Sequence, residues 1–107
     1  IIANNVTLFS GAKIYSDTQI GNNCVIHSSA ILGADGFGFS PNEKGEFIKV
    51  PQTGNVIIED NVWIGFNSTI LKGVIIGNGA IIEPGSLVLN DVLPGQKVSG
   101  NPAKPVL

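Results

Sequence analysis

The sequence is poor in the residues that cross-link chains or bind metals. Its 107 residues include one cysteine, Cys24, one histidine, His27, and no methionine. A single cysteine excludes an intrachain disulfide framework and a cysteine-based metal cluster. It is typical of a reducing compartment, so we expect a cytoplasmic protein. The acidic residues are not spaced with this histidine or cysteine as metal ligands would be, and we predict no metal site.

Strong charge and long apolar segments are also missing. Six lysine and arginine residues stand against eight aspartate and glutamate residues, which gives a net charge of −2. Without a basic stripe, the chain has no electrostatic surface for nucleic acid. No apolar run approaches the roughly 18 to 20 residues of a membrane-spanning helix, so we predict no membrane insertion.

What the sequence has instead is a repeat of six residues that begins at Ile2. The first position of each repeat is aliphatic: Ile2, Leu8, Ile14, Ile20, Ile26, Leu32, Ile58, Ile64, Ile70, Ile76, Ile82 and Val88. The fifth position is small or β-branched: Val6, Ala12, Thr18, Cys24, Ala30, Gly36, Val62, Ser68, Val74, Ala80, Ser86 and Val92. A period of six fits neither a helix nor a simple strand, and it is typical of a short strand and a turn repeated along a solenoid.

We therefore predict an all-β fold, a parallel β-helix of about four coils, in which three repeats make one triangular coil. First-position side chains stack inside and fifth-position side chains lie near corners. Asn, Asp and Gly at the third and fourth positions make the turns. Residues 1–107 form a single domain, with coils over 2–37 and 58–93, an inserted loop over 38–57 and a C-terminal tail over 94–107.

The inserted loop interrupts the repeat without shifting its phase. Pro41, Asn42 and Gly45 predict a turn, and Phe39 and Phe47 lie on either side of it. Such a flap would pack its aromatic side chains on the coils or on a neighbouring chain. Long ordered loops often have a function, so the structural and the functional interpretation both stay open.

One outward column of the coils is mostly apolar. Every third repeat shares a side of the triangle, and the second positions of one side are Tyr15, Gly33, Leu71 and Leu89. An outward apolar column on a solenoid is more often a subunit contact than a ligand groove. Three triangular prisms side by side form a closed assembly, so we predict a homotrimer.

The repeats resemble those of the left-handed β-helix hexapeptide-repeat acyltransferases, which implies a left-handed coil. In residues 1–62, GNNCVIHSSAILGADGFGF, a loop and KVPQTGNVIIEDNV resemble the UDP-3-O-acylglucosamine N-acyltransferases of lipid A synthesis. In residues 63–107, the ending DVLPGQKVSGNPAK resembles the C-terminal coils of hexapeptide O-acetyltransferases. The resemblance implies acyl transfer to a sugar or a nucleotide sugar. The acyl donor would be acyl-CoA or acyl carrier protein, with no tightly bound cofactor.

His27 is the candidate general base. An imidazole would take the proton from an amine or a hydroxyl as that group attacks a thioester. His27 occupies an outward second position in one column with Phe9, Gly65 and Glu83, and we expect Gly65 to leave room above the ring. The same register also predicts a solvated or interface side chain. The A-H-N segment that holds the base in the lipid A enzymes has no counterpart here.

The resemblance also implies a donor site. Lys104, in GNPAK, matches a basic residue that meets the donor, and Lys97 is a second candidate; a solvated charge is the alternative for both. Phe66 and Pro84 are bulky at outward positions that are usually small in the acetyltransferases, which argues against tight donor binding. Cys24, at an inward fifth position, is predicted to be a packing residue.

Three functions stay open on these grounds. In the first, the chain is of the lineage of the lipid A N-acyltransferases that it resembles, and whether this piece is active stays open. Alternatively, it is a trimeric acetyl-CoA-dependent sugar O- or N-acetyltransferase, or a catalytically inert structural or engineered β-helix. Because the chain opens on Ile1 and joins two family signatures, we expect a fragment or chimera of a longer protein.

Overall fold

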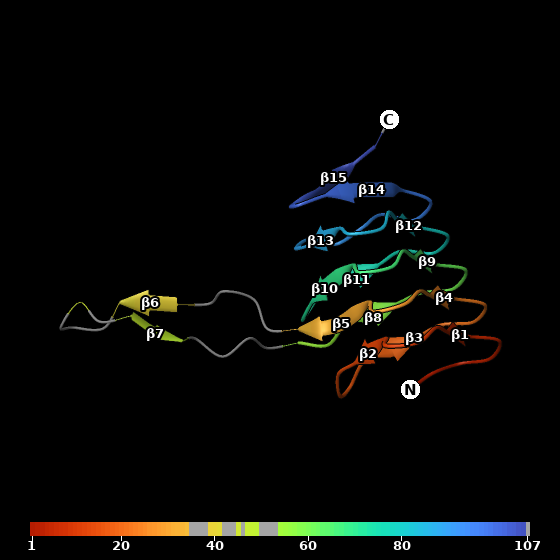
Figure 1. Cartoon of the computed structure of the whole chain (residues 1–107), viewed down its shortest axis with the longest axis horizontal. Coiled ribbons are helices and arrows are strands. Elements are labelled where there is room, and N and C mark those ends of the chain that lie inside the picture. The colour runs from red at the N-terminus through yellow and green to blue at the C-terminus, as the bar shows by residue number, and fades with distance from the viewer. Residues whose placement is uncertain (35–38, 42–44, 46, 50–53, 107) are drawn as a thin grey trace.

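The structure, a computed structural model, describes residues 1–34, 39–41, 45, 47–49 and 54–106, and it stacks short strands into coils (Figure 1). In chain order these are β1 (Thr7–Leu8), β2 (Lys13–Ile14), β3 (Gln19–Ile20), β4 (Val25–Ile26), β5 (Ile31–Ala34), β6 (Phe39–Pro41), β7 (Phe47–Lys49), β8 (Ile57–Ile58), β9 (Trp63–Ile64), β10 (Thr69–Leu71), β11 (Ile75–Ile76), β12 (Ile81–Ile82), β13 (Leu87–Val88), β14 (Lys97–Gly100) and β15 (Ala103–Pro105). The described residues contain no helix, and so none that is long and apolar enough to span a membrane.

The coils stack in register at intervals of eighteen residues. Thr7 lies opposite Val25, and Thr69 lies opposite Leu87, both in parallel pairs. Three sheets form the three sides: a six-stranded sheet β1-β4-β9-β12-β14-β15, a four-stranded sheet β13-β10-β5-β2 and a three-stranded sheet β11-β8-β3. This arrangement confirms the predicted all-β parallel β-helix.

The core is the column of first-position aliphatic side chains. The buried ones are Ile20, Ile26, Leu32, Ile58, Ile64, Ile70, Ile76, Ile82 and Val88. The fifth positions are buried beside them at Thr18, Cys24, Ala30, Val62, Ser68, Val74, Ala80 and Ser86. The first coil departs from this prediction, because Ile2 and Leu8 are 48% and 44% exposed. These two side chains have a neighbouring coil on only one side, so stacking covers only part of each.

The turns lie where the repeat places its small polar residues. Left-handed backbone angles occur at Asn5, Gly11, Asp17, Asn23, Ser29, Asn61, Asn67, Gly73, Gly79 and Gly85. Glycine, asparagine and aspartate adopt this conformation more readily than other residues. At one corner the polar side chains also join the coils. The backbone N–H of Asn4 donates to Asn22 Oδ1 at 3.0 Å, and the backbone N–H of Asn22 donates to Asp60 Oδ1 at 2.7 Å.

The chain returns to the stack earlier than the predicted loop over 38–57 would allow. Val56 is buried, and Ile57 lies opposite Gln19 in strand register, so these two residues fill a fifth and a sixth position. The repeat pattern placed Gly36 and Phe37 there, and both lie outside the described residues. The pattern could not distinguish the two placements, because the excursion has the same length in either. Within it, β6 and β7 pair antiparallel and lie away from the stack of coils (Figure 1).

The stack also continues past Leu93, into the expected tail. Val92 lies opposite Ile76, and Val98 lies opposite Ile82, each sixteen residues further along the chain. The last coil is therefore two residues shorter than the others, and Val92 occupies a strand position rather than a corner. β15 then runs antiparallel to β14 and forms the edge of the six-stranded sheet.

The close approach of neighbouring coils leads to a first prediction. A Cβ atom added to Gly77 would lie 2.5 Å from the backbone nitrogen of Pro94. We expect Gly77→Ala to lower the free energy of unfolding by about 1 to 3 kcal/mol, because the two coils must move apart. Urea denaturation, followed by the fluorescence of the single tryptophan, measures this change.

Gly79→Asn is the matched control for this variant. Gly79 has a φ of 74°, and an added Cβ would meet no atom within 4 Å. Asparagine tolerates that conformation, so we expect a change within about 0.5 kcal/mol. Equal destabilisation by both substitutions would contradict the close packing at Gly77.

Candidate functional site

The three candidate residues predicted from the sequence, the base and the two donor-binding lysines, lie on one side of the β-helix. His27 directly follows β4, Lys97 opens β14 and Lys104 lies in β15, and these strands belong to the same six-stranded sheet. β9 and β12 separate β4 from β14. At about 4.8 Å per strand, β4 lies roughly 14 Å from β14.

The imidazole of His27 lies between two aromatic rings. Phe9, next to β1, stacks on it with ring centroids 4.5 Å apart and an interplanar angle of 1°. Trp63, in β9, meets it at 5.0 Å with an angle of 62°. The backbone is held as well, because the His27 amide donates to the Ile64 carbonyl at 2.9 Å. The side chain is thus half-buried and packed, rather than extended into solvent.

The open space that the repeat predicted above His27, at Gly65, is filled. Gly65 is buried, and the backbone of Pro84 lies 2.5 Å from the place where its Cβ would be. Pro84 therefore packs into the position that a side chain at residue 65 would fill. The prediction that Gly65 leaves room was wrong, because the turn of the following coil occupies it.

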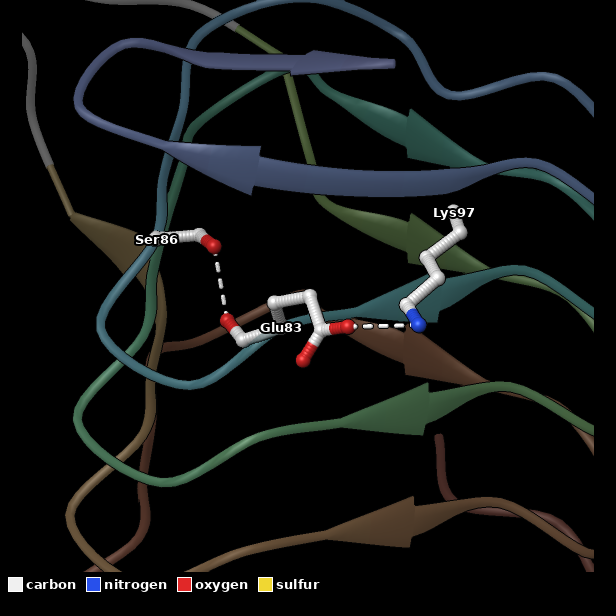
Figure 2. Close-up of polar contacts among 3 residues, drawn as sticks. All are labelled: Glu83, Ser86 and Lys97. Atoms are coloured by element: carbon white, nitrogen blue, oxygen red, sulfur yellow. Dashed lines mark hydrogen bonds and ion pairs between the residues drawn. The ribbon is translucent and has the colours of Figure 1, made fainter. Parts of the chain in front are cut away.

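Glu83 and Lys97 form an ion pair on this sheet (Figure 2). Lys97 Nζ lies 2.8 Å from Glu83 Oε1, and the side chains are 49% and 31% exposed. The main chain of Glu83 is also fixed, because the hydroxyls of Ser86 and Ser68 donate to its carbonyl at 2.6 Å and 3.0 Å. The Glu83 carboxylate thus has a cationic partner, and Lys97 is engaged before any ligand binds.

Lys104 lies beyond this pair at the end of the sheet. It is exposed and lies opposite Ser99 in the antiparallel pair of β14 and β15. Directly opposite residues of such a pair project to the same face of a sheet. Ser99 follows the inward Val98 and therefore faces outward, so Lys104 shares the outer face.

A second group of polar residues lies at the neighbouring corner. Glu59, Asp60 and Asn78 line an open pocket of about 360 Å³. Both carboxylates already accept backbone hydrogen bonds. The backbone N–H of Asn78 donates to Glu59 Oε1 at 2.9 Å, and the backbone N–H of Asn22 donates to Asp60 Oδ1. The carboxylate oxygens that line this pocket are thus used in hydrogen bonds between neighbouring coils.

Cys24 lies in the core, as its position in the repeat predicted. It is fully buried, and its Sγ lies 3.0 Å from the Glu59 carbonyl, to which the thiol donates. Burial raises the pKa of the Cys24 thiol, and the nearby Asp60 carboxylate raises it further. The thiolate is therefore disfavoured, and Cys24 is a packing residue rather than a nucleophile.

The sequence indicated one of the two neighbours of His27. Phe9 shares its column by the eighteen-residue spacing, whereas Trp63 was missed. Trp63 is in register with Val25, two residues before His27, so the contact runs diagonally across the sheet. The alignment of Trp63 with Val25 follows from the repeat once the inserted segment is left out. A diagonal contact also depends on the direction of the side chains, which the spacing of the repeat does not describe.

Comparison with known sequences agrees with this architecture. The bacterial transferase hexapeptide family, with six repeats, matches residues 1–34 and 55–90. The UDP-3-O-acylglucosamine N-acyltransferase of Coxiella burnetii is 47% identical over 92 residues, which cover 82% of this chain and 27% of that protein. The enzyme of the same name from Polynucleobacter asymbioticus is 46% identical over 89 residues. The chain thus spans about a quarter of the length of these relatives.

Solved structures give the same result for the fold. A polySia-specific acetyltransferase superposes with a TM-score of 0.80 at 31% identity, over 98% of this chain and 47% of its own. A hexapeptide-repeat acetyltransferase from Vibrio cholerae gives 0.79 at 26% identity, over 97% of this chain and 59% of its own. The expected left-handed parallel β-helix is confirmed. The chain belongs to the bacterial hexapeptide-repeat transferases, in the lineage of acyltransferases that the sequence resembled.

Proposed function

We propose that this chain is the acyl-transfer part of an enzyme that acylates the amine of an amino-sugar nucleotide. The observation that supports it best is the placement of His27, Lys97 and Lys104 on one six-stranded sheet. The acceptor follows from relatives named UDP-3-O-acylglucosamine N-acyltransferase, one of which is 47% identical over 92 residues. The presence of a base and cations on one surface suits transfer from a thioester donor.

In the proposed reaction, His27 acts as the general base. The acceptor nitrogen attacks the thioester carbonyl, and a carbon–nitrogen bond forms while the carbon–sulfur bond breaks. The imidazole takes the proton that the amine loses and then passes it to the departing thiolate, which leaves as a free thiol. The chain's own contribution is to hold the ring on the sheet and to move one proton.

The lysines would bind the donor at the far end of the same sheet. We propose acyl-CoA or acyl carrier protein as donor, because a phosphate-bearing arm could extend along the outer face from His27 to Lys104. The roughly 14 Å between β4 and β14 suits an elongated donor. Lys104 is the stronger candidate, since Lys97 is already paired with Glu83. One structural relative, a serine acetyltransferase, was solved in complex with CoA.

A sugar O- or N-acetyltransferase that uses acetyl-CoA is the second candidate. It is favoured by the polySia-specific acetyltransferase, whose structure matches almost the whole chain. The two candidates differ in acceptor and acyl length, and both use the same base and donor residues. Absence of turnover with either class of substrate would favour the inert scaffold instead.

We also propose that the chain acts as a homotrimer in the cytoplasm. Support for the trimer comes from the side of the coil formed by β13, β10, β5 and β2, where Tyr15 and Leu89 are 48% and 41% exposed. Leu71, half-buried, lies between them on that sheet. Apolar side chains exposed in one column suit a contact between copies. The reduced, buried Cys24 suits a cytoplasmic location.

The role of His27 gives a prediction about rate. We expect His27→Gln to lower kcat by about a hundredfold or more, because the amide cannot take the proton from the acceptor. Release of free thiol from acetyl-CoA and longer acyl-CoA donors, over a panel of amino-sugar nucleotides and sugars, measures it. An unchanged rate in His27→Gln, with the thermal midpoint also unchanged, would exclude His27 as the base.

The donor site gives a prediction about affinity. We expect Lys104→Ala to raise the KM for the CoA donor about fivefold to tenfold with little change in kcat, because a charged contact to phosphate is lost. Lys13→Ala is the matched control, since Lys13 is an exposed lysine on β2, in a different sheet. An equal change in KM for both variants would show a nonspecific effect of charge.

The trimer gives a prediction about mass. Light scattering is expected to give three chains, and Leu89→Asp is expected to reduce this to one, because three carboxylates would be buried at the contact. Leu93→Asp is the matched control, since Leu93 is 65% exposed and precedes the turn of the last coil. A wild-type mass of one chain would contradict the trimer.

A further inference from the structure

His27 lacks the usual polar partner of a general base. In a catalytic triad, a third group hydrogen-bonds the imidazole and sets its orientation. Within the described part of the chain, neither ring nitrogen of His27 has a hydrogen bond or an ion pair. The carboxylate on the same side of the sheet, Glu83, is paired with Lys97 instead.

Aromatic contacts fill this place. β1 and β9 flank β4 in the sheet, so Phe9 and Trp63 approach the imidazole from opposite sides along the stack. The stacked ring of Phe9 covers one face of His27, with the two rings nearly parallel at 1°. An aromatic pair of this kind stabilises its geometry beyond the effect of the area that it buries. Rotation of the imidazole out of its plane would lose both contacts.

We propose that Phe9 and Trp63 are the positioning residues of His27. They fix the plane of the imidazole, so that the base meets the acceptor with its nitrogen-bearing edge and not with its face. This inference rests on the proposed function, in which His27 is the base. It adds that the rings of two neighbouring coils set the orientation that a carboxylate sets in a triad.

The composition of the chain makes the inference accessible to spectroscopy. Because the chain has a single histidine, its imidazole gives one set of ring resonances without assignment by other means. The stacked ring of Phe9 shields the imidazole protons, and this shielding reports the contact directly. The test therefore has a readout that does not require turnover.

The test compares four variants by NMR of the imidazole and by steady-state kinetics. In Phe9→Leu we expect the imidazole protons to lose their shielding, and in Trp63→Leu we expect their resonances to shift because the edge contact is lost. In both variants we expect kcat to fall about tenfold to a hundredfold, with KM unchanged. Phe9→Tyr keeps the ring and is expected to retain both properties. Tyr15→Leu removes a ring of similar exposure from the same coil and is expected to leave the imidazole resonances as they are.

The outcomes separate this inference from the proposed function. If His27→Gln abolishes turnover while kcat is unchanged in Phe9→Leu and Trp63→Leu, the positioning inference is wrong and the base remains. Unchanged imidazole resonances in both leucine variants would also overturn the inference. If the wild type turns over no donor and acceptor, both fail together. A loss of kcat in Phe9→Leu that Phe9→Tyr restores supports positioning over a general effect on folding.

Discussion

The hydrogen-bonded ladder between successive coils is the interaction on which the rest of this structure depends. Each coil donates from its strands to the coil beside it, as when the His27 amide donates to the Ile64 carbonyl at 2.9 Å. Because this ladder holds parallel strands in register, it decides which side chains become neighbours. The stacking of Ile26 beneath Ile64 in the core and the contact of Phe9 with His27 outside it have the same cause.

The ladder also explains how an excursion of the chain leaves the fold intact. β5 ends at Ala34, and the stack resumes with Val56 and Ile57 in the positions that close the same coil. A segment inserted at a corner does not change the register, because the strands on either side still find the same partners. The six-stranded sheet consequently continues from the residues before the excursion to those after it, and it joins His27 to Lys97 and Lys104.

The chemistry of the sheet follows from what lies beside each polar group. Lys97 is neutralised by Glu83, so only Lys104 among the candidate lysines presents an exposed ammonium without an ion pair in the described part of the chain. His27 is enclosed by rings and not by charges. Cys24, the other group with nucleophilic chemistry, is removed from reaction by burial. The outer face of this sheet is therefore where we propose that acyl transfer takes place.

The six-residue period alone determined the all-β solenoid, its inward aliphatic column and the turn positions. Each repeat has an aliphatic residue where a short strand forms and small polar residues where the chain turns. The period also predicted that Phe9 and His27 share a column and that Cys24 is buried. Only the tertiary structure decided where the excursion leaves the stack, since the period reads the same for either placement. It also decided the short last coil, the Glu83–Lys97 pair and the contact of Trp63 with His27. These depend on diagonal side-chain contacts and on how tightly one turn packs on the next, as Pro84 does on Gly65, and a one-dimensional period contains neither quantity.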